Sequence, residues 1–338
     1  MEMENTEQAF PSASPPGPST AGSVRRAVID IGTNSVKLLV AAVSGRRVEP
    51  LLEGSEQTRL GSGFYETRRL QPAAIAHTAR VVAGFGEKAR EWAAAPIRVI
   101  ATSATRDATN QDELLDAVRR AAGLEVEIIS GEQEADWVFR GVVSDPVFGG
   151  RPLLIVDVGG GSTEFILGNG DQQRFRHSFP IGTVRLMEQL SRNDPPSTAA
   201  WERCRATVNS FLDGHVLPAV APELRAFPAR AVQLVGTGGT TTILARIELG
   251  LVAFDRDRIE AFRLGREQIV RLRERLWNLP LTERRKIAGL PSDRADVILT
   301  GVSIYESLME KFDFSDLRAS TRGLRFAAVM DKADGPVL

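Results

Sequence analysis

The chain has 338 residues, of which 43% are hydrophobic and 25% are charged, and this length predicts two domains rather than one hydrophobic core. The formal net charge of -1 excludes a globally basic surface, and no apolar run is long enough to span a bilayer, so we expect neither a nucleic-acid nor a membrane partner. The single cysteine, Cys204, excludes an internal disulfide, and the three histidines are too scattered for a zinc-type cluster. These features favour a cytoplasmic protein in which any bound metal has oxygen ligands.

The N-terminal residues differ in composition from the rest of the chain. Residues 1–23 are rich in Pro, Ser, Gly and Glu, which predicts a disordered tail. The folded part begins with two β-branched runs, AVIDIG and SVKLLVAAV, joined by a glycine-containing turn. A second turn at residues 45–47 follows, so this region is expected to form a β-meander.

Helices and strands then alternate. A helix is expected over residues 71–94, followed by the buried strand IRVIAT. Asn110 with Glu113 predicts a capping box for a helix that ends at Ala122, and Ser130 with Gln133 predicts another beyond the strand EVEII.

The pattern of the N-terminus returns after the turn-rich segment SDPVFGGRP. Strand LLIVDV, a glycine turn and strand FILG repeat the earlier order, with Asp30 aligned on Asp157 and Ser35 on Ser162. We interpret this as an internal duplication at the scale of a domain. A strand QLVGTGG, a helix from Thr240 and a buried amphipathic helix that starts near Val297 are expected beyond it.

Both copies carry a turn suited to phosphate. DIGTNS and DVGGGST place an acidic residue at a strand end and then glycines and hydroxyl side chains, so that successive N–H groups can point at one anion. One copy alone fits an ordinary hairpin equally well, but two copies and three consecutive glycines favour a phosphate site. A third turn leads into a helix whose N-terminus also suits an anion. The candidate phosphate-binding residues are Asp30, Gly32, Thr33, Asn34, Ser35, Gly159, Gly160, Gly161, Ser162, Thr163, Gly236, Thr237, Gly238 and Gly239.

Asp157 would repel a phosphate bound beside it unless a cation lay between them. We therefore predict a magnesium site at Asp157, which manganese can also fill. Asp30 occupies the equivalent place in the first copy, and its role as metal ligand, water-orienting group or turn cap stays open. Three glutamates compete for the role of base, namely Glu132, Glu134 and Glu164, and the predicted helix start at Ser130 only mildly favours Glu134.

The sequence resembles the exopolyphosphatase and guanosine pentaphosphate phosphatase family of the actin, sugar kinase and Hsp70-like superfamily. The resemblance rests on seven segments in family order: AVIDIGTNSVKLLV, VIATSATRDATN, ISGEQEADWVFRGV, IVDVGGGSTEF, LVGTGGTT, GLPSDRADVILTG and STRGLR. It implies an α/β fold in which two ribonuclease H-like domains face each other across a cleft. The domains would be residues 24–144, completed by the returning C-terminal helix 315–338, and residues 145–314. The additional C-terminal domain of longer relatives is not expected.

The resemblance also implies roles for individual residues. Glu134, in the Gly-x-x-Glu-Ala motif, would be the catalytic base, Glu164 would close the second phosphate motif, and Arg106 would face the phosphates. Lys37 could point into the cleft or to solvent, and its role stays open.

The implied activity is the release of terminal orthophosphate from inorganic polyphosphate. Hydrolysis of guanosine pentaphosphate is the alternative within the family. An ATP-dependent kinase of the same superfold and a non-catalytic alarmone sensor are weaker alternatives, and assembly as a homodimer is compatible with the sequence.

Overall fold

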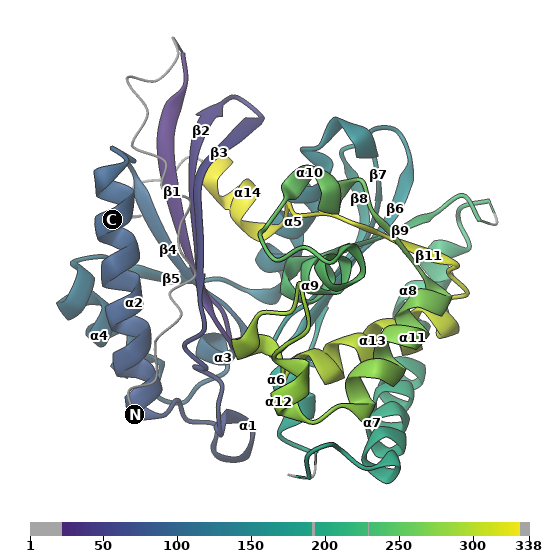
Figure 1. The fold of residues 1–338 in the computed structure, drawn as a ribbon. Coiled ribbons are helices and arrows are strands. Elements are labelled where there is room, and N and C mark those ends of the chain that lie inside the picture. The colour runs from purple at the N-terminus through teal and green to yellow at the C-terminus, as the bar shows by residue number, and fades with distance from the viewer. Residues whose placement is uncertain (1–21, 191–192, 229, 332–338) are drawn as a thin grey trace.

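The computed structural model describes residues 22–190, 193–228 and 230–331. The expected disordered tail therefore lies almost entirely outside the described residues, as do residues 332–338. Within the described residues, the strands form two sheets, and Figure 1 shows the first on the left and the second on the right. We call the parts built on them domain I and domain II. None of the helices in the described part of the chain has the length and apolar character needed to span a bilayer.

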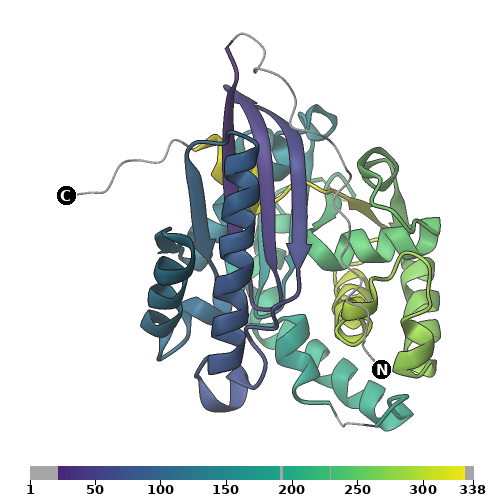
Figure 2. The ribbon, with the colours of Figure 1, turned by 60° about the vertical axis from the view of Figure 1, so that its left-hand side comes forward.

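The first sheet has the strand order β3-β2-β1-β4-β5. β1, β2 and β3 form the predicted antiparallel meander, while β4 and β5 run parallel to β1. Helices α2 and α4 cover one face, and Figure 2 shows α2 lying along the sheet. The bounds are β1 (Val24–Ile31), β2 (Val36–Ser44), β3 (Arg47–Glu56), β4 (Ile97–Ala101), β5 (Val126–Ile128), α2 (Pro72–Glu91) and α4 (Gln111–Ala122).

The second sheet has the order β10-β11-β9-β6-β7-β8. β6, β7 and β8 form an antiparallel meander, β9 is parallel to β6, and β11 is parallel to β9. The series β8-β7-β6-β9-β11 therefore repeats the topology of the first sheet, which confirms the predicted duplication, and β10 is an added edge strand. The bounds are β6 (Pro152–Val158), β7 (Thr163–Asn169), β8 (Gln172–Phe179), β9 (Gln233–Thr237), β10 (Arg263–Gly265) and β11 (Asp316–Ala319).

The remaining helices lie around and between the two sheets (Figure 1). They are α1 (Phe64–Thr67), α3 (Ser103–Arg106), α5 (Gly131–Val143), α6 (Thr183–Met187), α7 (Thr198–Phe211), α8 (Leu217–Leu224), α9 (Gly238–Leu249), α10 (Arg256–Glu260), α11 (Arg266–Asn278), α12 (Leu281–Arg284), α13 (Ile298–Lys311) and α14 (Leu324–Met330). Short 3₁₀ turns occur at Pro146–Phe148 and Ser292–Arg294, and a π-helical turn at Leu212–Val216 joins α7 to α8.

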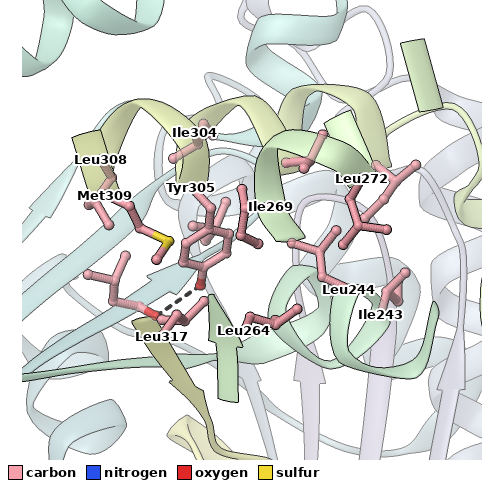
Figure 3. Packing of buried hydrophobic residues seen from close by; sticks show 14 of the residues in the cluster. Ile243, Leu244, Leu264, Ile269, Leu272, Ile304, Tyr305, Leu308, Met309 and Leu317 are labelled. Carbon is pink, nitrogen blue, oxygen red and sulfur yellow. Dashed lines mark hydrogen bonds between the residues drawn. The ribbon is translucent and has the colours of Figure 1, made fainter. Parts of the chain in front are cut away.

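Helix α13 is the centre of the domain II core. Every residue from Ile298 to Met309 is buried, which confirms the buried helix predicted from the apolar pattern near Val297. Tyr305 lies within this cluster in Figure 3, and its hydroxyl reaches the Val156 carbonyl at 3.3 Å and the Thr241 hydroxyl. The polar end of this large side chain is thus satisfied inside an apolar core.

Helices α5 and α14 pack against each other between the two sheets. At Gly141 of α5, a Cβ atom would overlap the carbonyl oxygen of Gly323, so the close approach requires glycine. The same core contains Val28 of the first sheet and Ile155 of the second. This shared layer joins the two domains.

The predicted start of the returning segment, residue 315, is wrong. Residues Asp316–Ala319 form β11, which pairs with β9 of the second sheet, and the chain returns to domain I only after Ala319. The returning helix is α14, which contacts β1 and β2.

Of the two predicted capping boxes, one is present in part, as the serine half of its pair of bonds. The Ser130 hydroxyl accepts from the Gln133 amide at 3.1 Å, as expected. The prediction for Asn110 is wrong, because its side chain makes no cap bond and instead pairs with both backbone groups of Leu70, at 2.9 and 3.1 Å. The backbone of Leu70, 40 residues earlier in the chain, thus binds the Asn110 side chain that a helix cap would have used. Helix α9 begins at Gly238, two residues earlier than predicted.

Candidate active site

The two glycine loops are closed by equivalent hydrogen bonds. The β1–β2 turn is closed by Gly32 N–H donating to the Ser35 carbonyl at 3.0 Å, and the β6–β7 turn by Gly159 N–H donating to the Ser162 carbonyl at 3.0 Å. Both loops open into one cleft between the domains. The predicted site residues that line this cleft are Asp30, Gly32, Thr33, Asn34, Ser35, Glu134, Asp157, Gly159, Gly160, Gly161, Ser162, Glu164 and Gly239.

The strand registers place charged side chains in pairs beside the loops. Asp157 lies directly opposite Glu164, and Asp30 lies directly opposite Lys37. Residues directly opposite on antiparallel strands project from the same face of the sheet. All four line the cleft, so Lys37 points into it and not to solvent.

Glu134 enters the cleft from the first turn of α5, which the Ser130 cap starts. Its Oε2 accepts from Arg106 Nη1 at 3.0 Å, and the same nitrogen donates to the Ile129 carbonyl at 3.1 Å. The Glu134 side chain is only 12% exposed. Glu132, in contrast, is exposed and lines a neighbouring groove. The geometry therefore favours Glu134 over Glu132, while Glu164 lines the same cleft.

Burial and mutual repulsion raise the pKa values of the carboxyl groups in the cleft. Burial raises the pKa of Glu134 to about 7, with Arg106 opposing the shift and the charges of Asp30 and Asp157 adding to it. Burial likewise raises the pKa of Asp157 to about 6, against the attraction of Lys37. The pKa of Glu164 lies well above its ordinary value because of burial and then the charges of Glu134 and Asp157. A cation would relieve this accumulation of negative charge.

Hydrogen bonds hold part of this group in place. Ser178 Oγ donates to Glu164 Oε1 at 2.7 Å, which favours the ionised form of that carboxyl. The start of α9 lies directly against the Asp157 carboxylate, because a Cβ atom at Gly238 would collide with Asp157 Oδ1. Gly238 also has a φ of +80°, a conformation that favours glycine.

Five predicted phosphate-binding residues do not line the cleft. Gly236 packs against Thr241 and Leu317, Gly238 lies against the Asp157 carboxylate, and the Thr237 hydroxyl donates to the Arg322 carbonyl at 2.8 Å. The Thr163 hydroxyl donates to the buried Ile181 carbonyl at 2.6 Å. Arg106 is the fifth residue: it holds Glu134 and lines the adjacent groove, which shares Ser103 and Ser162 with the cleft.

The three consecutive glycines have a further cause that the sequence did not indicate. At Gly161, a Cβ atom would meet the hydroxyls of Tyr65, Ser103 and Thr33, all from domain I. At Gly160, it would lie 2.9 Å from Thr33 Cβ. The second loop is therefore in direct contact with the opposite domain.

Sequence reasoning left the direction of Lys37 open and missed a second cation in the cleft, Arg294. Arg294 ends the 3₁₀ turn before α13, and burial lowers its pKa. The alignment of the two loops could have indicated Lys37, because it occupies the position that Glu164 has in the second copy.

The cleft fits magnesium through the chemistry of its donors. Within the described ranges, no three His, Cys, Asp or Glu side chains form a ready-made metal cluster. Magnesium, however, usually binds through one or two carboxylates together with water and substrate phosphate oxygens. Asp157 and Glu164 are a facing pair of such carboxylates beside a phosphate-type loop.

Comparison with known proteins gives consistent matches. A profile of the Ppx/GppA phosphatase family matches residues 39–334. Exopolyphosphatase 2 of Mycobacterium tuberculosis is 34% identical over 294 residues, which cover 84% of this chain and 89% of that protein.

Solved structures agree in fold. The Ppx/GppA enzyme of Aquifex aeolicus has a TM-score of 0.73 at 32% identity and covers 92% of this chain and 100% of its own. An exopolyphosphatase of Cytophaga hutchinsonii has a TM-score of 0.79 at 27% identity, with 90% and 96% covered. The paired sheets therefore form the two ribonuclease H-like domains of the actin-like fold.

Proposed function

The chain belongs to the Ppx/GppA phosphatase family, and on that premise we propose that this hydrolase is an exopolyphosphatase, which releases orthophosphate from the end of inorganic polyphosphate. The name of the Mycobacterium tuberculosis relative supports this substrate. Two facing phosphate-type loops in one cleft support it as well, because they suit consecutive phosphates of one chain.

One observation carries the proposal. The Glu134 carboxylate lies in the same cleft as both loops, is held by Arg106, and has its pKa raised to about 7. A general base works best when its pKa lies near the working pH. A phosphate-binding protein without catalysis would have no need of such a group.

The proposed reaction follows from these positions. Backbone N–H groups of the two loops and the hydroxyls of Ser35 and Ser162 bind the terminal phosphates, and Lys37 and Arg294 offset their charge. Glu134 takes a proton from a water molecule as the water oxygen attacks the terminal phosphorus, and the bond from that phosphorus to the bridging oxygen breaks. Orthophosphate leaves together with a polymer one unit shorter.

Arg106 is a positioning residue in this scheme, since it fixes the carboxylate that receives the proton. Magnesium held by Asp157 and Glu164 would neutralise charge on the phosphate that is transferred. We propose these metal ligands from their facing positions in the cleft.

The test is a side-by-side measurement of orthophosphate release from short polyphosphate, long polyphosphate, guanosine pentaphosphate and ATP, with and without magnesium. We expect polyphosphate to give the highest kcat/KM and Glu134→Gln to remove activity on every substrate. A preference for guanosine pentaphosphate would replace the proposal by the family alternative. Release from none of them would refute it.

A further inference from the structure

The two phosphate loops are copies of each other, but one equivalent position carries opposite charges. In domain II, Asp157 faces Glu164 across the β6–β7 hairpin, and in domain I, Asp30 faces Lys37 across the β1–β2 hairpin. Both pairs point into the cleft. Domain II therefore offers two carboxylates to a cation, whereas domain I offers one carboxylate and an ammonium group.

The charges near Lys37 come from both domains. Burial lowers the pKa of Lys37, while Asp30 and Asp157 favour its ammonium form and Arg325 and Arg294 oppose it. Arg325 is fixed beside it, since its Nη1 donates to the Leu38 carbonyl at 2.7 Å. Among the described residues, no hydrogen bond or salt bridge joins Lys37 to its hairpin neighbour Asp30 or to Asp157, so both carboxylates are open to ligands.

The internal repeat indicates what this lysine replaces. A carboxylate at its position would give domain I the same facing pair that domain II has, and with it a second potential metal site beside the first loop. Two such sites in one cleft would make the copies equivalent. An ammonium group at this position repels a divalent cation and supplies positive charge without needing ligands.

We propose that Lys37 is a positioning residue that confines the divalent cation to the domain II half of the cleft. The inference rests on the metal site of the proposed function, at Asp157 and Glu164. The single metal fixes which end of the cleft receives the phosphate that is transferred. Glu134 reaches that end from α5, which packs against β7 and β8 of domain II, and its charge acts on Glu164.

A purely structural role for Lys37 predicts something else. If it only neutralised Asp30 to stabilise the hairpin, its replacement would lower the melting temperature and leave metal binding unchanged. The number of metal ions bound per chain separates the two roles, and it is measured without any turnover.

The experiment counts manganese ions bound per chain, from the electron paramagnetic resonance signal of free Mn²⁺ in a titration of the full chain. We expect one ion for the wild type, one for Lys37→Arg and two for Lys37→Glu. The double variant Asp30→Asn with Lys37→Glu should return to one, because it loses a ligand of the new pair. One ion for Lys37→Glu, or two for the wild type, would overturn the inference. No ion bound by the wild type would instead refute the proposed metal site, and the inference with it.

A neutral substitution covers the case in which Lys37→Glu fails to fold. Lys37→Gln removes the repelling charge without adding a ligand, so the single site should bind Mn²⁺ more tightly, on the order of tenfold, with a smaller gain at high salt. An unchanged or weaker affinity in a variant with native circular dichroism would overturn the inference.

Discussion

Substitution of Glu134 by Gln tests the proposed chemistry most directly. Gln keeps the size of the side chain and an oxygen that can accept from Arg106 Nη1, so the 3.0 Å contact and the shape of the cleft should remain. What it removes is the ability to take a proton. General-base catalysis contributes about 10²- to 10⁴-fold, so kcat should fall by that factor, or about 3–5 kcal/mol in the barrier. KM should hold or fall, because one negative charge facing the phosphates is lost.

The dependence of the rate on pH gives a second readout. With a pKa of about 7, Glu134 is half ionised at neutral pH, and lowering the pH by one unit should reduce the wild-type rate to about a fifth of its value at pH 7. This acidic limb should disappear in Glu134→Gln. The assay is the initial rate of orthophosphate release from polyphosphate between pH 5 and 9.

Stability provides the control against unfolding. Burial raises the pKa of Glu134 above its ordinary value of 4.5, so the folded state favours the protonated form. The stability linked to that form is fully present below pH 4.5 and is lost as the pH rises through about 7. Because Gln does not ionise, Glu134→Gln does not lose this stability and should melt at or above the wild-type temperature at pH 8.

The matched control is Glu132→Gln, which alters an exposed carboxylate two residues away on the same helix. We expect near-native turnover and stability. If Glu134→Gln kept near-native turnover while Glu164→Gln was inactive, the base would lie elsewhere and the reasoning would be refuted.

The remaining predictions concern the groups around this base. Arg106→Ala should shift the acidic limb of the pH profile to higher pH, since Arg106 lowers the pKa of Glu134, and an unshifted limb would exclude the positioning role. Gly238→Ala should abolish turnover and lower stability by about 1–3 kcal/mol in a thermal melt, because its Cβ would displace the Asp157 carboxylate at a positive φ. Gly239→Ala, whose Cβ meets no atom within 4 Å, should melt like the wild type. Chelation should abolish orthophosphate release, magnesium or manganese should restore it, and Asp157→Asn should require more metal; activity that resists chelators would exclude the metal role.

Much of the fold could be predicted because its signals are local. Alternating β-branched runs around glycine turns, such as AVIDIG and LLIVDV, predicted both meanders and the duplication that the sheet orders show. The end of domain II could not be placed in this way. Whether Asp316–Ala319 pairs with β9 or continues towards α14 depends on a strand some 80 residues earlier in the chain, and nothing in its own four residues decides it.

The same limit explains what was wrong or left open at single residues. The Ser130 hydroxyl caps its helix, whereas Asn110 carries an equally good motif but bonds to the backbone of Leu70 and to the Glu113 side chain. Because side chains alternate along a strand, Lys37 points to one face of the sheet, and its neighbours Val36 and Leu38 point to the other. This alternation does not show which face borders the cleft. That depends on the second domain.

The three glycines of the second loop show how closely the site depends on contact between the domains. A run of glycines suggests a ligand near the backbone, but at Gly161 the nearest atoms are domain I hydroxyls, including that of Tyr65. Arg185 of domain II contacts both Gly161 and Tyr65. Its Nε donates to the Gly161 carbonyl at 3.0 Å, and its guanidinium carbon lies 4.2 Å from the centroid of the Tyr65 ring. Glu188 completes the contact by accepting from the Gly63 and Tyr65 amides at 2.6 and 3.2 Å. A side chain at position 161 would therefore force the domains apart before it removed any phosphate contact. The same glycines that line the cleft therefore also form part of the contact between the domains.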